Sequence, residues 1–70
     1  MNPSTTIALN GAPHPLADTI LLDRLLDLLG LAGKPVVVEL NEQPVFPRDY
    51  PRTLVEPGAR LEIVTLAAGG

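Results

Sequence analysis

Hydrophobic and polar residues alternate at the start of the chain, which is the pattern of a half-buried strand. In "TTIALNGAPHPLAD", Ile7 and Leu9 fall on one face of an extended segment and polar or small residues fall on the other. Asn10-Gly11 follows at once, and this dipeptide accepts the positive φ angles of a two-residue hairpin turn. We expect a short return strand over His14–Ala17, and its prolines mark it as a sheet edge.

The next segment, "DTILLDRLLDLLG", changes to the period of a helix. Its leucines recur at i, i+3, i+4 and i+7, which places one apolar stripe against a core and charged residues on the opposite face. We expect Asp18 or Thr19 to cap the N-terminus of this helix. Gly30 is well placed to end it in the left-handed conformation. The stripe consists of Leu22, Leu25, Leu26 and Leu29.

Two more strands and an irregular segment follow the helix. "PVVVELN" is rich in β-branched residues, and its pattern points Val36, Val38 and Leu40 inward. A short strand is expected around Val45. The proline-rich stretch "PRDYPRTLVEPG" predicts one helical turn and ends in a Pro-Gly turn signal.

The last strand lies in "ARLEIVTLAAGG" and has the strongest apolar pattern without a proline. Leu61 and Ile63 should face the core, whereas Val64 and Leu66 should face away from it. Because this strand carries no edge signal, we expect it to lie centrally in the sheet.

The order of these elements predicts an α+β domain with two layers, in which a small mixed sheet of four to five strands packs on one helix. We assign residues 1–66 to this domain and residues 67–70 to a flexible tail. Repeats and low-complexity tracts are absent from the sequence, which favours a single domain.

Composition narrows the functional classes. The 70 residues include no cysteine, which excludes disulfides, thiolate metal sites and cysteine nucleophiles. The net charge is −3 and the five basic residues are scattered, so the sequence does not predict a nucleic-acid-binding surface. An acidic body instead suits a protein partner with a basic surface. Charges interrupt the apolar run around the helix and "MNPSTT" lacks signal-peptide features, so we expect no membrane segment and a cytoplasmic location.

Candidate catalytic groups are sparse. His14 stands between two prolines near a turn, with no evident nucleophile or carboxylate beside it. Asp23 and Asp27 are four residues apart on the predicted helix and could form a carboxylate pair, but we expect a solvated face without a pocket. The chain has no glycine-rich loop that opens a helix and so no phosphate cradle. We therefore expect a protein that is not an enzyme on its own.

The outward face of the sheet offers a candidate docking patch. Apolar residues on the face opposite the helix would sit together and could receive a partner, although small proteins commonly expose a few such side chains. The patch consists of Val37, Val64, Leu66 and Ala8.

The chain ends in Gly69-Gly70, directly after its best strand. Glycines have no side chain and an unrestricted backbone, so such a tail can extend through a narrow channel. This is what a terminal carboxylate needs if it is the substrate of another enzyme. Activation as a mixed anhydride with AMP would make it attackable by sulfur or nitrogen. A frayed terminus is the simpler alternative.

Five segments in the same order and spacing resemble the ubiquitin-like sulfur carrier proteins, most closely those of thiamin biosynthesis, the ThiS proteins. The resemblance covers nearly the whole chain and implies the β-grasp fold. This chain departs from many relatives at Ala59, where they have an acidic residue, and in the small residues before Gly-Gly. The segments are "IALNGAP", "LLDLLGL", "VVVELN", "VFPR" and "EPGARLEIVTLAAGG".

The resemblance implies a role for the tail. A ThiF-like adenylyltransferase would adenylate the Gly70 α-carboxylate, using ATP and magnesium that this chain does not itself bind. A sulfur donor derived from a cysteine desulfurase would convert it to a thiocarboxylate, and thiazole synthase would take the sulfur. Gly69 would keep the tail slim in the partner's channel. Three alternatives stay open: the small subunit of molybdopterin synthase, a ubiquitin-like protein modifier and a purely structural β-grasp domain.

Overall fold

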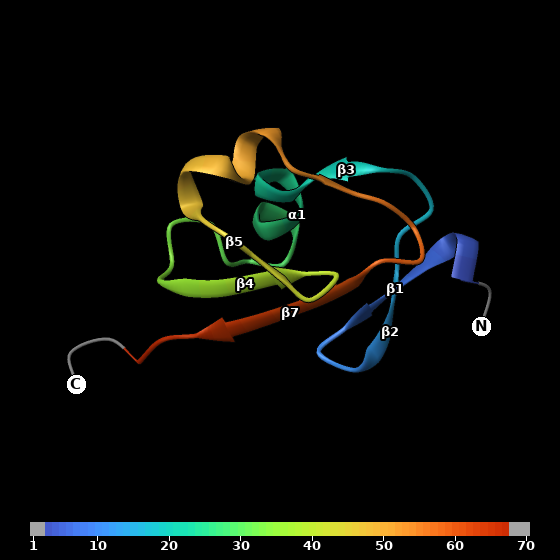
Figure 1. The fold of residues 1–70 in the computed structure, drawn as a ribbon, viewed down its shortest axis with the longest axis horizontal. Helices are drawn as coiled ribbons and strands as arrows, with labels where there is room; N and C mark the ends of the chain where they lie inside the picture. The colour runs from blue at the N-terminus through green and yellow to red at the C-terminus, as the bar shows by residue number, and fades with distance from the viewer. Residues whose placement is uncertain (1–2, 68–70) are drawn as a thin grey trace.

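The computed structural model describes residues 3–67, which form two layers with a curled sheet below and a helix above (Figure 1). Five strands make one sheet in the order β2-β1-β7-β4-β5, and two short strands, β3 and β6, pair separately. β1 and β7 are parallel and the remaining pairs are antiparallel. The elements are η1 Pro3–Thr5, β1 Thr6–Leu9, β2 Ala12–Pro15, β3 Ile20–Leu21, α1 Leu22–Leu28, β4 Val36–Leu40, β5 Gln43–Val45, η2 Pro47–Arg52, β6 Leu54–Val55 and β7 Arg60–Thr65.

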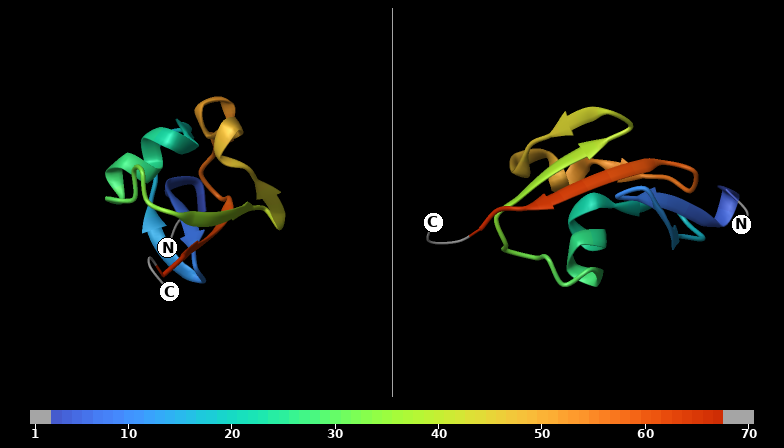
Figure 2. Two further views of the ribbon diagram at one scale, coloured as in Figure 1. Left: turned by 90° about the vertical axis from the view of Figure 1, so that its left-hand side faces the viewer. Right: turned by 90° about the horizontal axis from the view of Figure 1, so that it is seen from below.

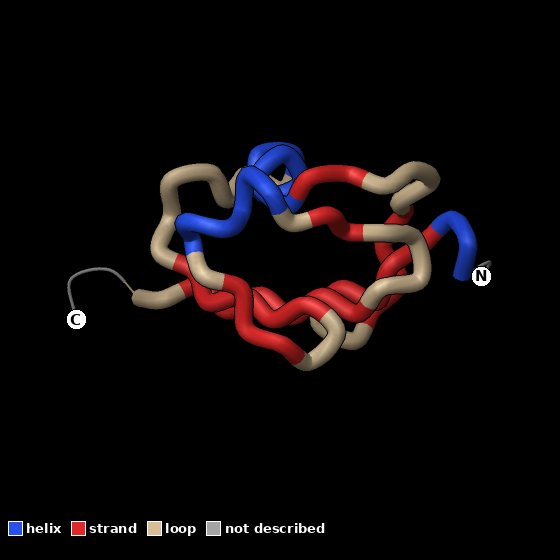
Figure 3. Tube along the Cα trace, turned by 45° about the horizontal axis from the view of Figure 1, so that its top comes forward, coloured by secondary structure: helices blue, strands red, loops and turns tan. Residues whose placement is uncertain are grey.

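The predicted fold class is confirmed, and β7 lies in the middle of the sheet as expected. The helix covers one face of the sheet, and η2 lies on the same side (Figures 2 and 3). The pair β3–β6 was not predicted. It forms a second, two-stranded sheet, and Figure 3 places it on the helix side of the main sheet.

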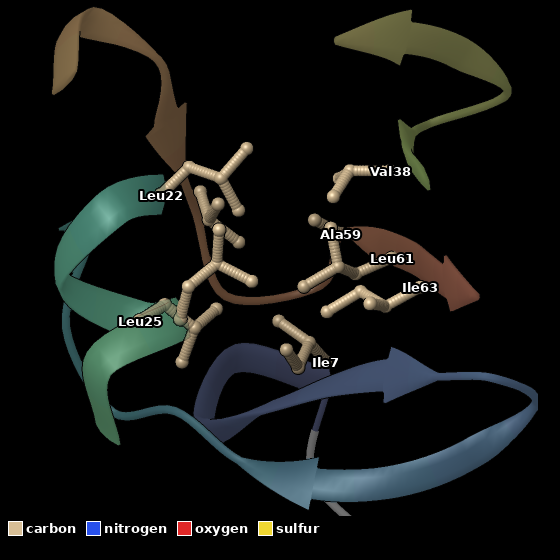
Figure 4. Packing of buried hydrophobic residues seen from close by; sticks show 9 residues of the cluster. Ile7, Leu22, Leu25, Val38, Ala59, Leu61 and Ile63 are labelled. Atoms are coloured by element: carbon tan, nitrogen blue, oxygen red, sulfur yellow. The ribbon is translucent and has the colours of Figure 1, made fainter. Parts of the chain in front are cut away.

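The core lies between α1 and the inner face of the sheet. Leucines of the predicted stripe meet inward side chains from the three central strands, and β7 contributes Leu61 and Ile63 (Figure 4). Residues of β4 and β7 point as the alternation predicts, with Val38, Leu61 and Ile63 buried. The buried cluster is Ile7, Leu22, Leu25, Leu26, Val38, Val55, Ala59, Leu61 and Ile63.

The first hairpin turns at Asn10-Gly11 as expected, but its return strand begins earlier than predicted. β2 spans Ala12–Pro15, so the predicted return strand at His14–Ala17 is wrong by two residues. Asn10 and Gly11 have φ angles of 51° and 83°, which make a two-residue turn, and pairing begins at once with Leu9 opposite Ala12. β2 lies at the sheet edge, as its prolines predicted.

The helix begins later than its apolar period suggests. Ile20 and Leu21 form β3 and pair with Val55 and Leu54, so α1 starts at Leu22. The predicted cap at Asp18 or Thr19 is therefore wrong, and within the described chain Leu21 at the N-cap makes no side-chain capping bond. A backbone group takes that place, because the Leu22 N–H donates to the Thr53 carbonyl at 2.8 Å.

The end of the helix agrees with the prediction. Gly30 has a φ of 75°, and its N–H donates to the Asp27 carbonyl at 3.0 Å. The Leu31 N–H donates to the Leu26 carbonyl at 2.8 Å. These two bonds form a Schellman motif, which satisfies carbonyls at the helix end and turns the chain toward β4.

Candidate functional site

The end of β7 determines where the chain leaves the domain. Thr65 pairs with Val36 at the start of β4, and the Leu66 N–H donates to the Pro35 carbonyl at 2.8 Å. β7 therefore has a backbone partner up to Leu66. The structure describes one residue more, Ala67, and the predicted site residues Gly69 and Gly70 lie outside the described residues.

Three of the four residues of the predicted patch come together next to this exit. Val64 and Val37 face each other across β7 and β4, and their side chains are 60% and 50% exposed. Leu66 follows two positions later on the same face and is 48% exposed. We name these three residues the exit patch. Its docking role stays a prediction.

The fourth residue, Ala8, is not part of this patch. It is exposed on the same face, but it lies opposite Arg60, four residues before Val64 on β7. At about 3.3 Å per residue, four positions separate them by roughly 13 Å along the strand. The expectation that Ala8 sits with the valines is therefore wrong, because the parallel pairing of β1 with β7 begins at the opposite end of β7.

On the helix side, the pair Asp23 and Asp27 does not lie on a plain solvated face. Both residues line an open hollow of about 460 Å³ between α1, the loop after it and η2. We expected a solvated face without a pocket. Asp27 is exposed as expected, but the absence of a pocket is wrong, because η2 packs beside the polar edge of α1. We name this feature the helix-side hollow, lined by Asp23, Leu26, Asp27, Leu31, Ala32, Gly33, Lys34, Pro35, Val36, Pro47 and Tyr50.

Two buried polar atoms have no hydrogen-bond partner among the described residues, the Asp23 Oδ1 and the Tyr50 hydroxyl, and both belong to residues that line the helix-side hollow. Burial raises the pKa of the Tyr50 hydroxyl above its ordinary value near 10. The sequence analysis missed Tyr50. The sequence did offer a signal for it, a tyrosine among prolines and charged residues in an irregular segment. A tyrosine in such a place commonly buries its ring and directs its hydroxyl to a hydrogen-bond partner.

His14 lies on the edge strand β2, with its Nδ1 3.0 Å from the Pro15 carbonyl. Within residues 3–67, the histidine, aspartate and glutamate side chains form no group of three that could hold a metal ion. No helix in that range is long and apolar enough to cross a membrane.

The arrangement of strands defines the class of protein. A first hairpin, a helix across the sheet and a last strand inserted parallel to the first make the ubiquitin-like β-grasp fold. The sequence assigns the chain within that class. It belongs to the ThiS family, whose family profile matches residues 6–70. The resemblance seen in the sequence is thereby confirmed.

Solved structures agree with this assignment. The crystal structure of the thiamine biosynthesis protein ThiS from Geobacter metallireducens is 28% identical, with a TM-score of 0.79 over 93% of this chain and 99% of that chain. The solution structure of a thiamine biosynthesis protein from the same organism is also 28% identical, with a TM-score of 0.77 over 93% and 87%. A relative described as uncharacterized protein ycf40, from Porphyra purpurea, is 26% identical over 70 residues, which is 100% of this chain and 99% of the relative.

Proposed function

We propose that this chain is a sulfur carrier protein that donates sulfur for thiazole formation in thiamin biosynthesis. The observation that carries the proposal is membership of the ThiS family over residues 6–70, a match that includes the C-terminal Gly-Gly. The solved structures that share its fold at 28% identity are described as thiamine biosynthesis proteins. The chain would act as a co-substrate of other enzymes.

The reacting group in this proposal is the α-carboxylate of Gly70. A carboxylate is a poor electrophile, so an adenylating partner would join it to AMP from ATP and release pyrophosphate. Sulfide would attack the acyl carbon and expel AMP, leaving a thiocarboxylate directly. A persulfide donor would first give an acyl disulfide, and a thiol would then reduce its S–S bond to release the thiocarboxylate. Thiazole synthase would accept that sulfur. ATP and magnesium would belong to the adenylating partner.

The end of the domain supports this role by its geometry. β7 is central in the sheet and paired on both sides, so it is a rigid base for the tail. The exit patch presents three exposed apolar side chains next to that base, which suits a partner that must hold the domain while it handles the tail. Gly69 would let the tail extend through a channel that a side chain would obstruct.

A pyrophosphate-exchange assay with the ThiF-like adenylyltransferase tests the proposal. The full chain should support ATP-dependent exchange, and a chain without Gly70 should not, because the reacting carboxylate is displaced. Gly69→Ala should slow exchange and leave the thermal unfolding of the domain unchanged. Exchange at the same rate without Gly70 would contradict the proposal.

A further inference from the structure

We propose that Asn10 is a site of spontaneous deamidation that the native fold protects, and that its conversion weakens the hold of the first hairpin on β7. Two hydrogen bonds from the Asn10 side chain to β7 slow the reaction, and the same two bonds are disturbed when it occurs. The reaction belongs to this chain alone and does not depend on the proposed function or on a partner protein.

The turn of the first hairpin supplies the reacting groups. In an Asn-Gly pair, the backbone nitrogen of the glycine can attack the side-chain carbonyl carbon of the asparagine. A five-membered succinimide forms, and ammonia leaves with the proton of the glycine N–H. Water then opens the ring at either carbonyl and gives aspartate or isoaspartate. Gly11 has no side chain to shield its nitrogen, and both Asn10 and Gly11 are exposed to the water that the second step consumes.

The native contacts of Asn10 oppose the first step. Its Oδ1 accepts the Ile63 N–H at 2.7 Å, and its Nδ2 donates to the Ile63 carbonyl at 3.1 Å. The Gly11 nitrogen can reach the Asn10 Cγ only if the carboxamide turns away from β7, so both bonds must break first. Two hydrogen bonds of about 1 kcal/mol each correspond to a reaction that is roughly thirtyfold slower.

A second asparagine occupies an equivalent place on the other side of β7. Asn41 follows β4, has a φ of 50°, and accepts the Arg60 N–H at 2.9 Å with its Oδ1. It is also exposed, but the next residue is Glu42, whose side chain hinders the attacking nitrogen. The third asparagine of the sequence, Asn2, precedes a proline, which has no N–H. Asn10 is therefore the asparagine with a reactive neighbour.

Conversion removes the donor that faces β7. A carboxylate has acceptors alone, so the bond to the Ile63 carbonyl is lost and two oxygens face each other. Isoaspartate also lengthens the backbone of the turn by one methylene. One added carboxylate takes the net charge from −3 to −4. The paired residues of β1 and β7 end at Leu9 and Leu61, so loss of the side-chain bonds shortens this ladder by two residues on the side of β7 that leads to the tail.

The first test follows deamidation of the full chain by peptide mapping and mass spectrometry, in native buffer and in guanidinium chloride at the same pH and temperature. Heavy-oxygen water labels carboxylates that form during the incubation. Asn10 should convert at least roughly thirtyfold more slowly in the native protein, and Asn41 should stay intact in both conditions. Equal rates for Asn10 in the two conditions, no conversion of Asn10 in denaturant, or conversion of Asn41 as fast as that of Asn10 would overturn the proposal.

Glu42→Gly is the matched variant for the chemistry. It gives Asn41 the same neighbour as Asn10, and a glycine suits the φ of 69° at this position. In denaturant, Asn41 of this variant should convert as fast as Asn10. If Asn41 stays intact, the neighbouring glycine does not decide the reactivity, and the assignment of Asn10 fails.

Asn10→Asp tests the consequence of conversion. It introduces the carboxylate directly, and the equilibrium constant for folding, measured by chemical denaturation, should fall roughly tenfold. Asn41→Asp is the matched control, because its bond to Arg60 uses Oδ1 as an acceptor and a carboxylate keeps that bond. We expect this variant to stay within roughly threefold of the wild type. Equal folding equilibria for Asn10→Asp and the wild type would overturn the claim that conversion weakens the hold on β7.

Discussion

The side chain of Asn10 bonds to both backbone groups of Ile63, a residue 53 positions away. Its Oδ1 accepts the Ile63 N–H at 2.7 Å and its Nδ2 donates to the Ile63 carbonyl at 3.1 Å. The paired residues of β1 and β7 end at Leu9 and Leu61, so the amide continues the ladder where β1 turns away. Asn41 acts similarly from the other side, since its Oδ1 accepts the Arg60 N–H at 2.9 Å. Asparagines at the ends of both neighbouring strands, β1 and β4, thus hydrogen-bond to β7, the strand that leads to the tail.

Replacing Asn10 should destabilise the domain more than its exposed position suggests. Asn10→Ala removes two hydrogen bonds and leaves a residue at a φ of 51°, so we expect a loss of roughly 2–4 kcal/mol in the free energy of unfolding. Chemical denaturation measures it. Asn10→Gly relieves the backbone strain and should lose roughly 1–3 kcal/mol, the part due to the two bonds. Equal stability of Asn10→Gly and the wild type would show that the amide contributes nothing.

The local pattern of apolar and polar residues predicted the fold. Features that depend on pairing between distant segments could not be predicted from that pattern. Alternation correctly assigned the inner and outer faces of β4 and β7, because side-chain direction depends on neighbouring residues alone. The start of α1 was missed because Ile20 and Leu21 continue the apolar run, while the partner strand β6 lies more than thirty residues later. The same limit explains Ala8, since its place on the sheet depends on the register between the first and last strands.

The same reason explains why one feature of the candidate site was predictable and the other was not. The exit patch was predictable as a set of outward residues on two strands, and pairing of β4 with β7 brought Val37 and Val64 together. The helix-side hollow was not predictable. It depends on how the irregular segment around Tyr50 folds back over α1, and no periodic pattern encodes that packing.

Two leucines on α1 test the core assignment. Leu25 is 2% exposed and Leu28, one turn later, is 75% exposed. Leu25→Ala should lower the free energy of unfolding by roughly 2–5 kcal/mol through lost burial and the cavity left behind. Leu28→Ala should change it by less than about 0.5 kcal/mol. Thermal unfolding followed by circular dichroism compares them, and similar shifts in Tm for the two variants would contradict the helix orientation.

The exit patch makes a prediction about binding. Val64→Asp should weaken association with the adenylating partner and change the free energy of unfolding by less than about 1 kcal/mol, since the side chain is already 60% exposed. Calorimetric titration measures the affinity. Leu54→Asp is the control, because Leu54 is 57% exposed but lies on β6 in the other sheet. If the two variants bind equally well, the exit patch is not the docking surface.

Burial of the Tyr50 hydroxyl predicts that the domain loses stability at alkaline pH. Burial favours its neutral hydroxyl, so the folded-state pKa lies above the unfolded value near 10. The stability that comes from this difference is complete below pH 10 and is lost as the pH rises through the folded-state pKa. Phenolate absorbance isolates this group because it is the single tyrosine. A midpoint that is the same in the native protein and in denaturant would contradict the burial of the hydroxyl.

The central claim is that Gly70 carries sulfur, and intact mass spectrometry tests it most directly. The full chain is incubated with ATP, magnesium, the adenylating partner and a sulfur source, and it is analysed without reducing or alkylating reagents. The account predicts a species heavier by the difference between one sulfur and one oxygen atom, with fragmentation locating the change at Gly70. A chain that is adenylated but keeps its carboxylate in the presence of the sulfur source would contradict the account.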